Sequence, residues 1–137
     1  MKISTRGRYA LRVMVDLAEN GNGNLVPLKD IAARQGVSQK YLESIMTELS
    51  KADMFGVHNG KGGGYRLNRP PEEYTVGEIL RVTEKDLAPV ACLEKTASSC
   101  PREKSCRTLP MWKKFYELIN GFFDGVTLSD LMLKDGK

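Results

Sequence analysis

Two short helical patterns separated by a Gly-Val-Ser turn constrain the fold of this chain more than any other feature. The apolar side chains of residues 28–34 lie on one helical face, and Gly36 ends that pattern. Ser38 is a good N-cap for a second helix that runs to about residue 52. The apolar positions are Leu28, Ile31 and Ala32 in the first helix and Leu42, Ile45, Met46 and Leu49 in the second. Two helices joined by a tight glycine-containing turn indicate a helix-turn-helix.

A longer helix is predicted before this unit, over residues 5–20. Its start carries three arginines, Arg6, Arg8 and Arg12. Positive charge is unfavourable near a helix N-terminus. We therefore expect these side chains either to meet a partner outside the chain or to remain solvated on the surface.

After the second helix, residues 55–57 and 65–67 alternate in the manner of two strands, with four glycines between them. This pattern predicts a β-hairpin wing. Because glycine has no side chain, such a tip lets the backbone approach a phosphate group closely. The alternative is a mobile hairpin loop; a nucleotide-binding loop is disfavoured, since no helix start follows and the Lys-Ser/Thr pair of a P-loop is absent.

The charge of the chain favours a polyanionic partner for its first half. Residues 1–70 carry 11 Lys or Arg against 6 Asp or Glu, whereas residues 71–137 carry 10 against 11. Polar residues gather at the start of the second helix, where a recognition helix meets DNA. The candidate DNA-binding residues are Ser38, Gln39, Lys40, Tyr41 and Glu43, with Asn59, Gly60, Lys61, Gly62 and Gly63 in the wing. An ordinary polar first turn is the alternative interpretation.

The C-terminal half is predicted to hold three more helices. Thr75 and Glu78 have the spacing of a capping box, which would open a helix over residues 76–82. Residues 111–124 form an amphipathic pattern, and Thr127 opens a last short helix. The predicted apolar side of residues 111–124 is Met111, Phe115, Leu118, Ile119, Phe122 and Phe123, opposite Lys113, Lys114, Glu117 and Asn120. This face and residues 131–133 are expected to pack on a second copy of the chain, the alternative being a core helix within one chain.

Three cysteines, Cys92, Cys100 and Cys106, lie in a polar stretch without periodicity, residues 86–109. Thiolates are the ligands of iron–sulfur clusters and zinc, and Arg102 and nearby cations favour the thiolate form. Gaps of seven and five residues fit no CxxC zinc site, which makes zinc the weaker choice. An iron–sulfur cluster, redox-active thiols and inert cysteines all remain open on the spacing.

Location and chemistry are bounded by what the sequence lacks. It has no stretch of about 20 apolar residues, and its first residues carry no apolar signal-peptide core, so a cytoplasmic protein without membrane contact is expected. The single histidine, His58, falls in the predicted wing. Acid–base catalysis therefore has no obvious site, and the chain is not expected to be an enzyme.

These patterns combine into one expectation for the fold class, which is mostly α. A winged helix-turn-helix with a β-hairpin wing would occupy residues 1–83, a cysteine-containing sensor loop residues 84–109, and a long dimerisation helix with a short helix after it residues 110–137. A chain of 137 residues can bury a core for this unit without disulfides or other staples.

Several motifs occur together in an order that resembles the Rrf2 family of winged-helix regulators over nearly the whole chain. They are Ser4-Thr5-Arg6-Gly7-Arg8-Tyr9-Ala10, Val26-Pro27-Leu28 with Asp30-Ile31, Gln35-Gly36-Val37-Ser38 with Tyr41-Leu42-Glu43, Gly60 with Gly62-Gly63-Gly64-Tyr65, Val76-Gly77-Glu78, the three cysteines, and Leu109-Pro110-Met111-Trp112. The resemblance is strongest to the members that regulate iron–sulfur cluster assembly. It implies a homodimeric repressor or activator that binds double-stranded operator DNA, holds a two-iron, two-sulfur cluster and controls cluster-assembly genes.

By the same resemblance, Ser38, Lys40, Tyr41 and Glu43 look like recognition-helix contacts. The residues from Gly60 to Gly64 look like a minor-groove wing, and Cys92, Cys100 and Cys106 look like the cluster ligands.

The chain departs from the family pattern at three positions. Asn59 replaces a common wing arginine, although Lys61 can supply the charge. Leu109 stands where the family has a ligand histidine, and Arg8 stands where nitric-oxide-sensing relatives have an acidic ligand. Oxygen donors for a fourth position are expected from the loop instead, from Glu94, Ser99, Glu103 or Ser105. A weakly held fourth position should make the cluster more labile.

Overall fold

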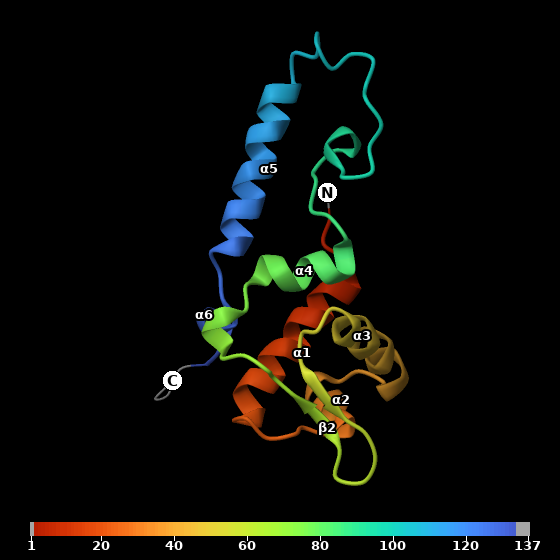
Figure 1. The fold of residues 1–137 in the computed structure, drawn as a ribbon, viewed down its shortest axis with the longest axis vertical. Helices are drawn as coiled ribbons and strands as arrows, with labels where there is room; N and C mark the ends of the chain where they lie inside the picture. The colour runs from red at the N-terminus through yellow and green to blue at the C-terminus, as the bar shows by residue number, and fades with distance from the viewer. Residues whose placement is uncertain (1, 134–137) are drawn as a thin grey trace.

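The elements follow the predicted order of a mostly helical chain with one hairpin. The computed structural model describes residues 2–133. In chain order the elements are α1 (Thr5–Gly21), α2 (Leu28–Gln35), α3 (Gln39–Lys51), β1 (Gly56–His58), β2 (Gly64–Arg66), the 3-10 turn η1 (Pro71–Glu73), α4 (Val76–Glu84), the 3-10 turn η2 (Ala91–Leu93), α5 (Leu109–Asp124) and α6 (Leu128–Leu131) (Figure 1). The predicted fold class, a winged helix-turn-helix followed by a C-terminal helix, is confirmed.

Side-chain caps determine where several helices begin. The Ser38 hydroxyl accepts a hydrogen bond from the Tyr41 N–H at 3.2 Å, as predicted for the start of α3. The capping box predicted at α4 forms only in part. Thr75 Oγ1 accepts from the Glu78 N–H at 3.0 Å, but the Glu78 carboxylate accepts from Arg69 at 2.8 Å. An ion pair with a distant arginine thus replaces the local return bond of the box.

The main core forms around α1, which packs against α2, α3, α4, α6 and β2. Helical spacing puts its small and apolar side chains on the inward face, and α3 supplies a matching stripe. The buried hydrophobic residues of these two helices are Ala10, Val13, Met14, Leu17 and Ala18, and Leu42, Ile45, Met46 and Leu49. Full burial of a Val, Leu, Ile or Met side chain stabilises the folded state by about 1.5–3 kcal/mol. Burial of these residues therefore holds the helix-turn-helix against α1.

One carboxylate, that of Asp16, is buried inside this unit with only 2 % of its surface exposed. It accepts from Arg34 Nε at 3.0 Å and Nη2 at 2.7 Å, and from Gln35 Nε2 at 2.9 Å. The hydrogen bond to Asp16 raises the pKa of Arg34. Removing the partners of a buried charge costs on the order of 3–5 kcal/mol. The end of α2, which carries Arg34 and Gln35, is therefore held firmly against Asp16 of α1.

Helix α5 extends away from this core and contains no buried residue (Figure 1). One side of it, Tyr116, Ile119 and Phe123, packs against Val76 and Leu80 of α4.

The prediction that all the apolar side chains of this helix share one face directed at a second copy of the chain is therefore wrong in detail. Ile119 and Phe123 face α4, and Asn120, predicted on the polar side, lies with them and accepts a hydrogen bond from Arg81 at 2.8 Å.

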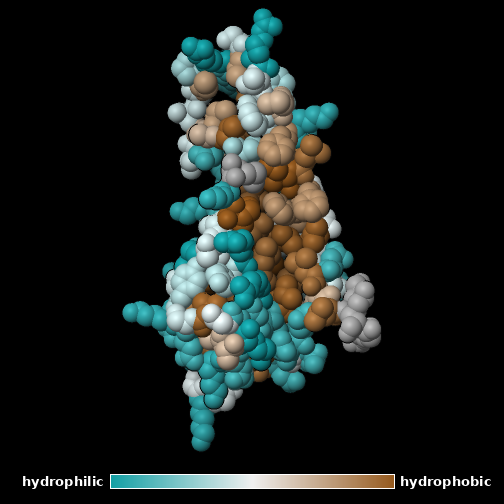
Figure 2. Space-filling view, turned by 180° about the vertical axis from the view of Figure 1, so that it is seen from behind, coloured by the Kyte–Doolittle hydropathy of each residue, from teal (hydrophilic) through white to brown (hydrophobic). Residues whose placement is uncertain are grey.

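The other apolar side of α5 stays open in the single chain. Met111, Phe115, Leu118 and Phe122 are between 42 % and 67 % exposed. Figure 2 shows a continuous hydrophobic band on the side of the molecule where α5 lies.

The short helix α6 is opened by Thr127, as predicted, and Thr127 and Asp130 form a complete capping box there. No helix among residues 2–133 is long and apolar enough to cross a membrane.

A buried tyrosine provides a test of the core. The Tyr74 ring is fully buried, and its hydroxyl lies 2.7 Å from the Met54 carbonyl oxygen, 2.9 Å from Asn68 Oδ1 and 3.2 Å from the Asn68 N–H. We expect Tyr74→Phe to lower the free energy of unfolding by about 1–3 kcal/mol, because these groups would lose a partner inside the protein.

Chemical denaturation measures this change. Tyr116→Phe is the control, since the Tyr116 hydroxyl has no hydrogen bond within residues 2–133, and it should change stability by less than about 0.5 kcal/mol. Equal effects of the two variants would contradict the assignment.

Candidate nucleic-acid interface and cysteine cavity

The start of α3 presents a row of polar side chains to solvent. Ser38, Gln39, Lys40 and Glu43 are exposed. The Ser38 hydroxyl oxygen is used as the helix cap, which leaves its hydrogen free to donate. Tyr41 differs from the others: it is half-buried, and its ring centroid lies 5.9 Å from that of Tyr9 in an edge-to-face arrangement. It therefore anchors this turn to α1 as well as bordering the exposed row.

The tip of the hairpin is a tight glycine turn. Asn59, Gly60, Lys61 and Gly62 are exposed, and the Gly63 N–H donates to the Gly60 carbonyl at 3.0 Å. Gly60 and Gly62 have φ angles of 93° and 76°, which side chains rarely tolerate. The turn chemistry thus explains these two glycines without any ligand, and it leaves Lys61 projecting from the tip.

The wing is also attached to the segment that precedes α2. The Val26 N–H donates to the Tyr65 carbonyl at 2.8 Å, and the Tyr65 N–H donates back at 2.9 Å. A Cβ atom at Gly64 would clash with the Val26 carbonyl oxygen, so this approach requires glycine. Our sequence analysis missed this pairing, for which the only local signal is a single β-branched residue before Pro27.

The three arginines of α1 are placed differently from what we expected. Arg6 pairs with Glu48 of α3 at 2.6 Å, and Arg12 donates to Gln35 at 2.9 and 2.8 Å. Partners within the chain therefore occupy two of them. Arg8 is exposed and donates only to Thr5 Oγ1, at 3.3 Å, within the described part of the chain.

All three cysteines line one cavity of about 200 Å³ between η2, the loop and the start of α5. The other lining residues are Leu93, Glu94, Ala97, Ser98, Ser99, Glu103, Leu109 and Lys113. Three of the four oxygen donors expected from the loop are among them, whereas Ser105 is not. Lys113, predicted only on the polar side of this helix, lies in the second turn of α5 and adds a cation to the cavity lining.

The thiols are accessible and in part polarised. Cys92 and Cys100 are exposed and Cys106 is half-buried. The Arg102 N–H donates to Cys100 Sγ at 3.4 Å, and Cys106 Sγ lies 3.5 Å from Thr108 Oγ1. The hydrogen bonds from the Thr108 side chain and backbone lower the pKa of Cys106. A lower pKa favours the thiolate, the form that binds metal and reacts with oxidants.

The donor set fits a thiolate-held iron–sulfur cluster in its chemistry. Three thiols and the carboxylates of Glu94 and Glu103 border the same cavity, while Leu109 contributes only apolar surface. Within residues 2–133, however, no three such side chains converge at metal-ligand spacing. Residues 94–105 are all exposed, so the loop has few packed contacts to break if it closes around a ligand.

The two candidate sites lie at opposite ends of the molecule. In Figure 1 the hairpin tip is at the bottom and the cysteine loop at the top, with α1 and α4 between them. Any communication between the cysteines and DNA must therefore cross the length of the molecule.

Together, the exposed start of α3, the wing and the thiol-lined loop define a winged-helix transcription regulator with a candidate sensor loop. A family model described as an iron-dependent transcriptional regulator, Rrf2, matches residues 3–134. The chain belongs to the Rrf2 family. Because this family and the relatives below are transcription regulators, the expectation that the chain is not an enzyme is confirmed.

The similar proteins include two named kinds of regulator, IscR and CymR. The chain is 36 % identical over 133 residues to the HTH-type transcriptional regulator IscR of Aliivibrio salmonicida, which covers 97 % of this chain and 78 % of the relative. Among solved structures it is similar to CymR, the global cysteine regulator of B. subtilis, with a TM-score of 0.77, 34 % identity and coverage of 96 % and 95 % of the two chains. It is also similar to T. potens IscR, with a TM-score of 0.73, 35 % identity and coverage of 96 % and 85 %.

Proposed function

We propose that this protein is a homodimeric regulator that binds double-stranded operator DNA, senses through an iron–sulfur cluster of the two-iron, two-sulfur type and controls genes of cluster biogenesis. The observation that carries the proposal is the cavity shared by Cys92, Cys100 and Cys106. Similarity to relatives named IscR supports it.

In this proposal the three segments of the chain divide the work. Residues 1–83 read DNA, residues 84–109 sense, and residues 110–137 dimerise, with Met1 and residues 134–137 outside the described part of the structure. Lys40 and Glu43 on α3 face the major groove, and the wing from Asn59 to Gly63 follows a phosphate backbone. Ser38, Gln39 and Tyr41 complete the α3 contacts.

The loop's own residues prepare the thiols for binding. Thr108 and the adjacent backbone stabilise the Cys106 thiolate, and the cationic Lys113 borders the same cavity. When bound, a cluster supplies a redox-sensitive anchor for the loop. Since Leu109 has no donor atom, we assign the fourth position to a loop carboxylate, Glu94 or Glu103.

The open face of α5 supports the dimer. Four large apolar side chains on a helix with no buried residue form an exposed patch of the kind that marks protein–protein interfaces. A regulator that reads two related half-sites needs a two-fold partner, and α5 offers a self-complementary apolar surface for it.

A second candidate function keeps the DNA-binding role and replaces the cluster by cysteine oxidation or a partner protein. The similarity to the global cysteine regulator CymR and the exposure of Cys92 and Cys100 favour it. In that case two thiolates form a disulfide, and a cellular oxidant such as a peroxide takes up the two electrons.

The first prediction from the proposed function concerns the wing. Replacing Lys61 with Ala should weaken binding to every DNA duplex to a similar extent and reduce the slope of log affinity against log salt by about one, because one phosphate contact is lost. Fluorescence anisotropy at several salt concentrations measures both quantities. Lys95→Ala, in the cysteine loop at the opposite end of the molecule, is the control and should change neither the affinity nor the salt slope. Unchanged affinity and slope in the Lys61 variant would show that the wing does not touch the backbone.

The second prediction concerns assembly. Leu118→Glu places a charge in the open apolar face of α5 and should yield monomer or insoluble protein. Glu117→Lys changes an exposed residue on the polar side of the same helix and should remain dimeric. Sedimentation equilibrium distinguishes these states. A folded and dimeric Leu118 variant would rule out this interface.

The third prediction concerns the cysteines. In anaerobically prepared protein, Cys92→Ala, Cys100→Ala and Cys106→Ala should each lose iron and sulfide together, because the remaining thiolates hold a cluster poorly. Each variant should stay dimeric and prefer the same operators as wild-type protein stripped of metal. Ser105→Ala is the loop control and should keep its iron. Full iron and sulfide in all three cysteine variants would favour the thiol-oxidation alternative.

A further inference from the structure

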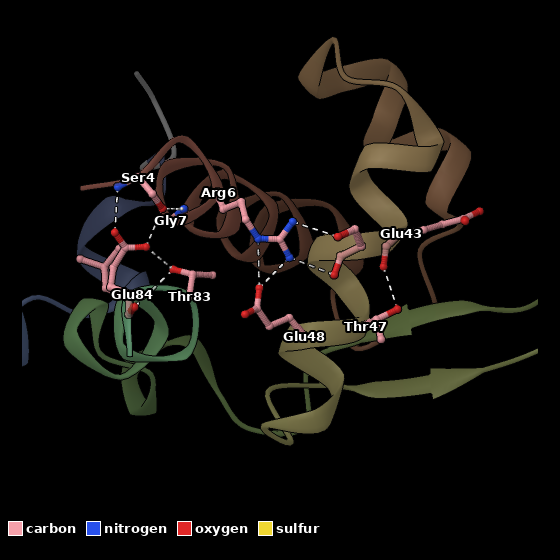
Figure 3. Close-up of polar contacts among 10 residues, drawn as sticks. Ser4, Arg6, Gly7, Glu43, Thr47, Glu48, Thr83 and Glu84 are labelled. Atoms are coloured by element: carbon pink, nitrogen blue, oxygen red, sulfur yellow. Dashed lines mark hydrogen bonds and ion pairs between the residues drawn. The ribbon is translucent and has the colours of Figure 1, made fainter. Parts of the chain in front are cut away.

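The first turn of α1 joins the base of the cysteine loop to the recognition helix, as Figure 3 shows. On one side, Ser4 contacts Glu84, the last residue of α4 and the residue from which the loop departs. The Ser4 N–H and hydroxyl donate to the two Glu84 carboxylate oxygens at 2.8 and 2.6 Å. The Thr83 hydroxyl donates to the same carboxylate at 2.8 Å. Glu84 thereby caps α1 from the end of another helix.

The chemistry of this contact favours an ionised carboxylate. Burial alone would raise the pKa of Glu84, but the hydrogen bonds from Ser4 and Thr83 outweigh it and lower the pKa. A negative charge at the N-terminus of α1 is also favourable to the helix dipole. Gly7 makes room for it: a Cβ atom there would lie 2.8 Å from Glu84 Oε2 and 3.2 Å from Thr83 Oγ1.

On its other side, the same turn holds α3 through Arg6. The guanidinium donates to Glu48 Oε1 from Nε at 3.2 Å and from Nη2 at 2.6 Å. It also donates to Ser44 Oγ at 2.9 Å and to the Ser44 carbonyl at 3.2 Å. Ser44 and Glu48 are four residues apart, on one face of α3, and Ser44 directly follows the candidate base-reading residue Glu43. The planar fork of donors holds the helix at two consecutive turns.

We propose that Arg6 is a positioning residue for DNA readout, and that the turn from Ser4 to Gly7 couples the state of the cysteine loop to the orientation of α3. The inference rests on the proposed function, in which α3 reads operator DNA. A shift of Glu84 when the loop closes moves the N-terminus of α1, and Arg6 passes that shift to the recognition helix. Arg6 itself touches no base.

The structure offers a matched control for Arg6. Arg69 and Glu78 form a second Arg–Glu ion pair, with an N–O distance of 2.8 Å compared with 2.6 Å for Arg6 and Glu48. The side chains of the two pairs are also similarly exposed. The values are 32 % for Arg69 and 35 % for Glu78, and 35 % for Arg6 and 33 % for Glu48. We expect Arg6→Gln and Arg69→Gln to lower the thermal midpoint of unfolding similarly. A merely structural role predicts that their DNA binding will also be similar.

The binding experiment uses a duplex that the wild-type dimer selects from a random-sequence library. Arg6→Gln should lower affinity for this duplex about tenfold, or about 1.4 kcal/mol, while its affinity for unselected duplex changes less than about twofold. Arg69→Gln should change neither by more than about twofold. Equal ratios of selected to unselected affinity in the two variants would overturn the positioning role.

A second experiment tests the coupling without DNA. Glu84→Gln should accelerate amide hydrogen exchange at residues 44–49 of α3 several-fold, while Glu78→Gln, also on α4, leaves these amides unchanged. Unchanged exchange in the Glu84 variant would overturn the coupling. A wild-type protein that selects no duplex would overturn the proposed function and with it the readout role of Arg6, whereas the exchange result would still decide the coupling.

Discussion

The burial of α1 is the constraint on which the rest of the structure depends. Its inward face supplies the core for the helix-turn-helix, and its flanks contact α4, α6 and the wing strand β2. Asp16 adds a charged tie to the end of α2, in a place where leaving it unpaired would be strongly unfavourable. A helix that serves as core on all these sides cannot move relative to one neighbour without affecting the others. A displacement of α1 would therefore reach the recognition helix and the wing at the outer edges of the N-terminal unit.

Most of the fold could be predicted because it is encoded locally. Helical periodicity and caps such as Ser38 placed the helices to within a few residues, and the glycine pattern predicted the hairpin. What could not be predicted depends on contacts between distant segments. Nothing near Arg6 in the sequence indicates Glu48, and nothing near Val26 indicates Tyr65. Part of the apolar side of α5 packs on α4 and part stays exposed, and this division could not be predicted without the position of α4. Periodicity shows that one side of a helix is apolar, but not which element covers it.

The candidate sensor illustrates the same division. The sequence indicated thiol chemistry at Cys92, Cys100 and Cys106, but only the fold brings them to one cavity together with Lys113. A loop without apolar periodicity has no local pattern from which its conformation could be read, because its position is determined by the helices at its two ends. Those ends, Glu84 of α4 and Leu109 of α5, are also where a change in the loop must act. One end meets the cap of α1, and the other begins the helix that we assign to the dimer.

The two candidate sensing chemistries differ in how far they can drive such a change. Moving a two-state equilibrium from 1:99 to 99:1 requires about 5.5 kcal/mol of differential free energy. A disulfide that closes a loop of about 15 residues contributes about 3 kcal/mol. Metal binding can be coupled to folding by more than this, since structural zinc binds zinc-finger peptides with apparent free energies of about 10–16 kcal/mol. Residues 94–105 are exposed, so closure of the loop breaks little packing, although ordering these residues uses part of the free energy of binding. Under the proposed function, a cluster held by Cys92, Cys100 and Cys106 would therefore bias the equilibrium further than a single disulfide does.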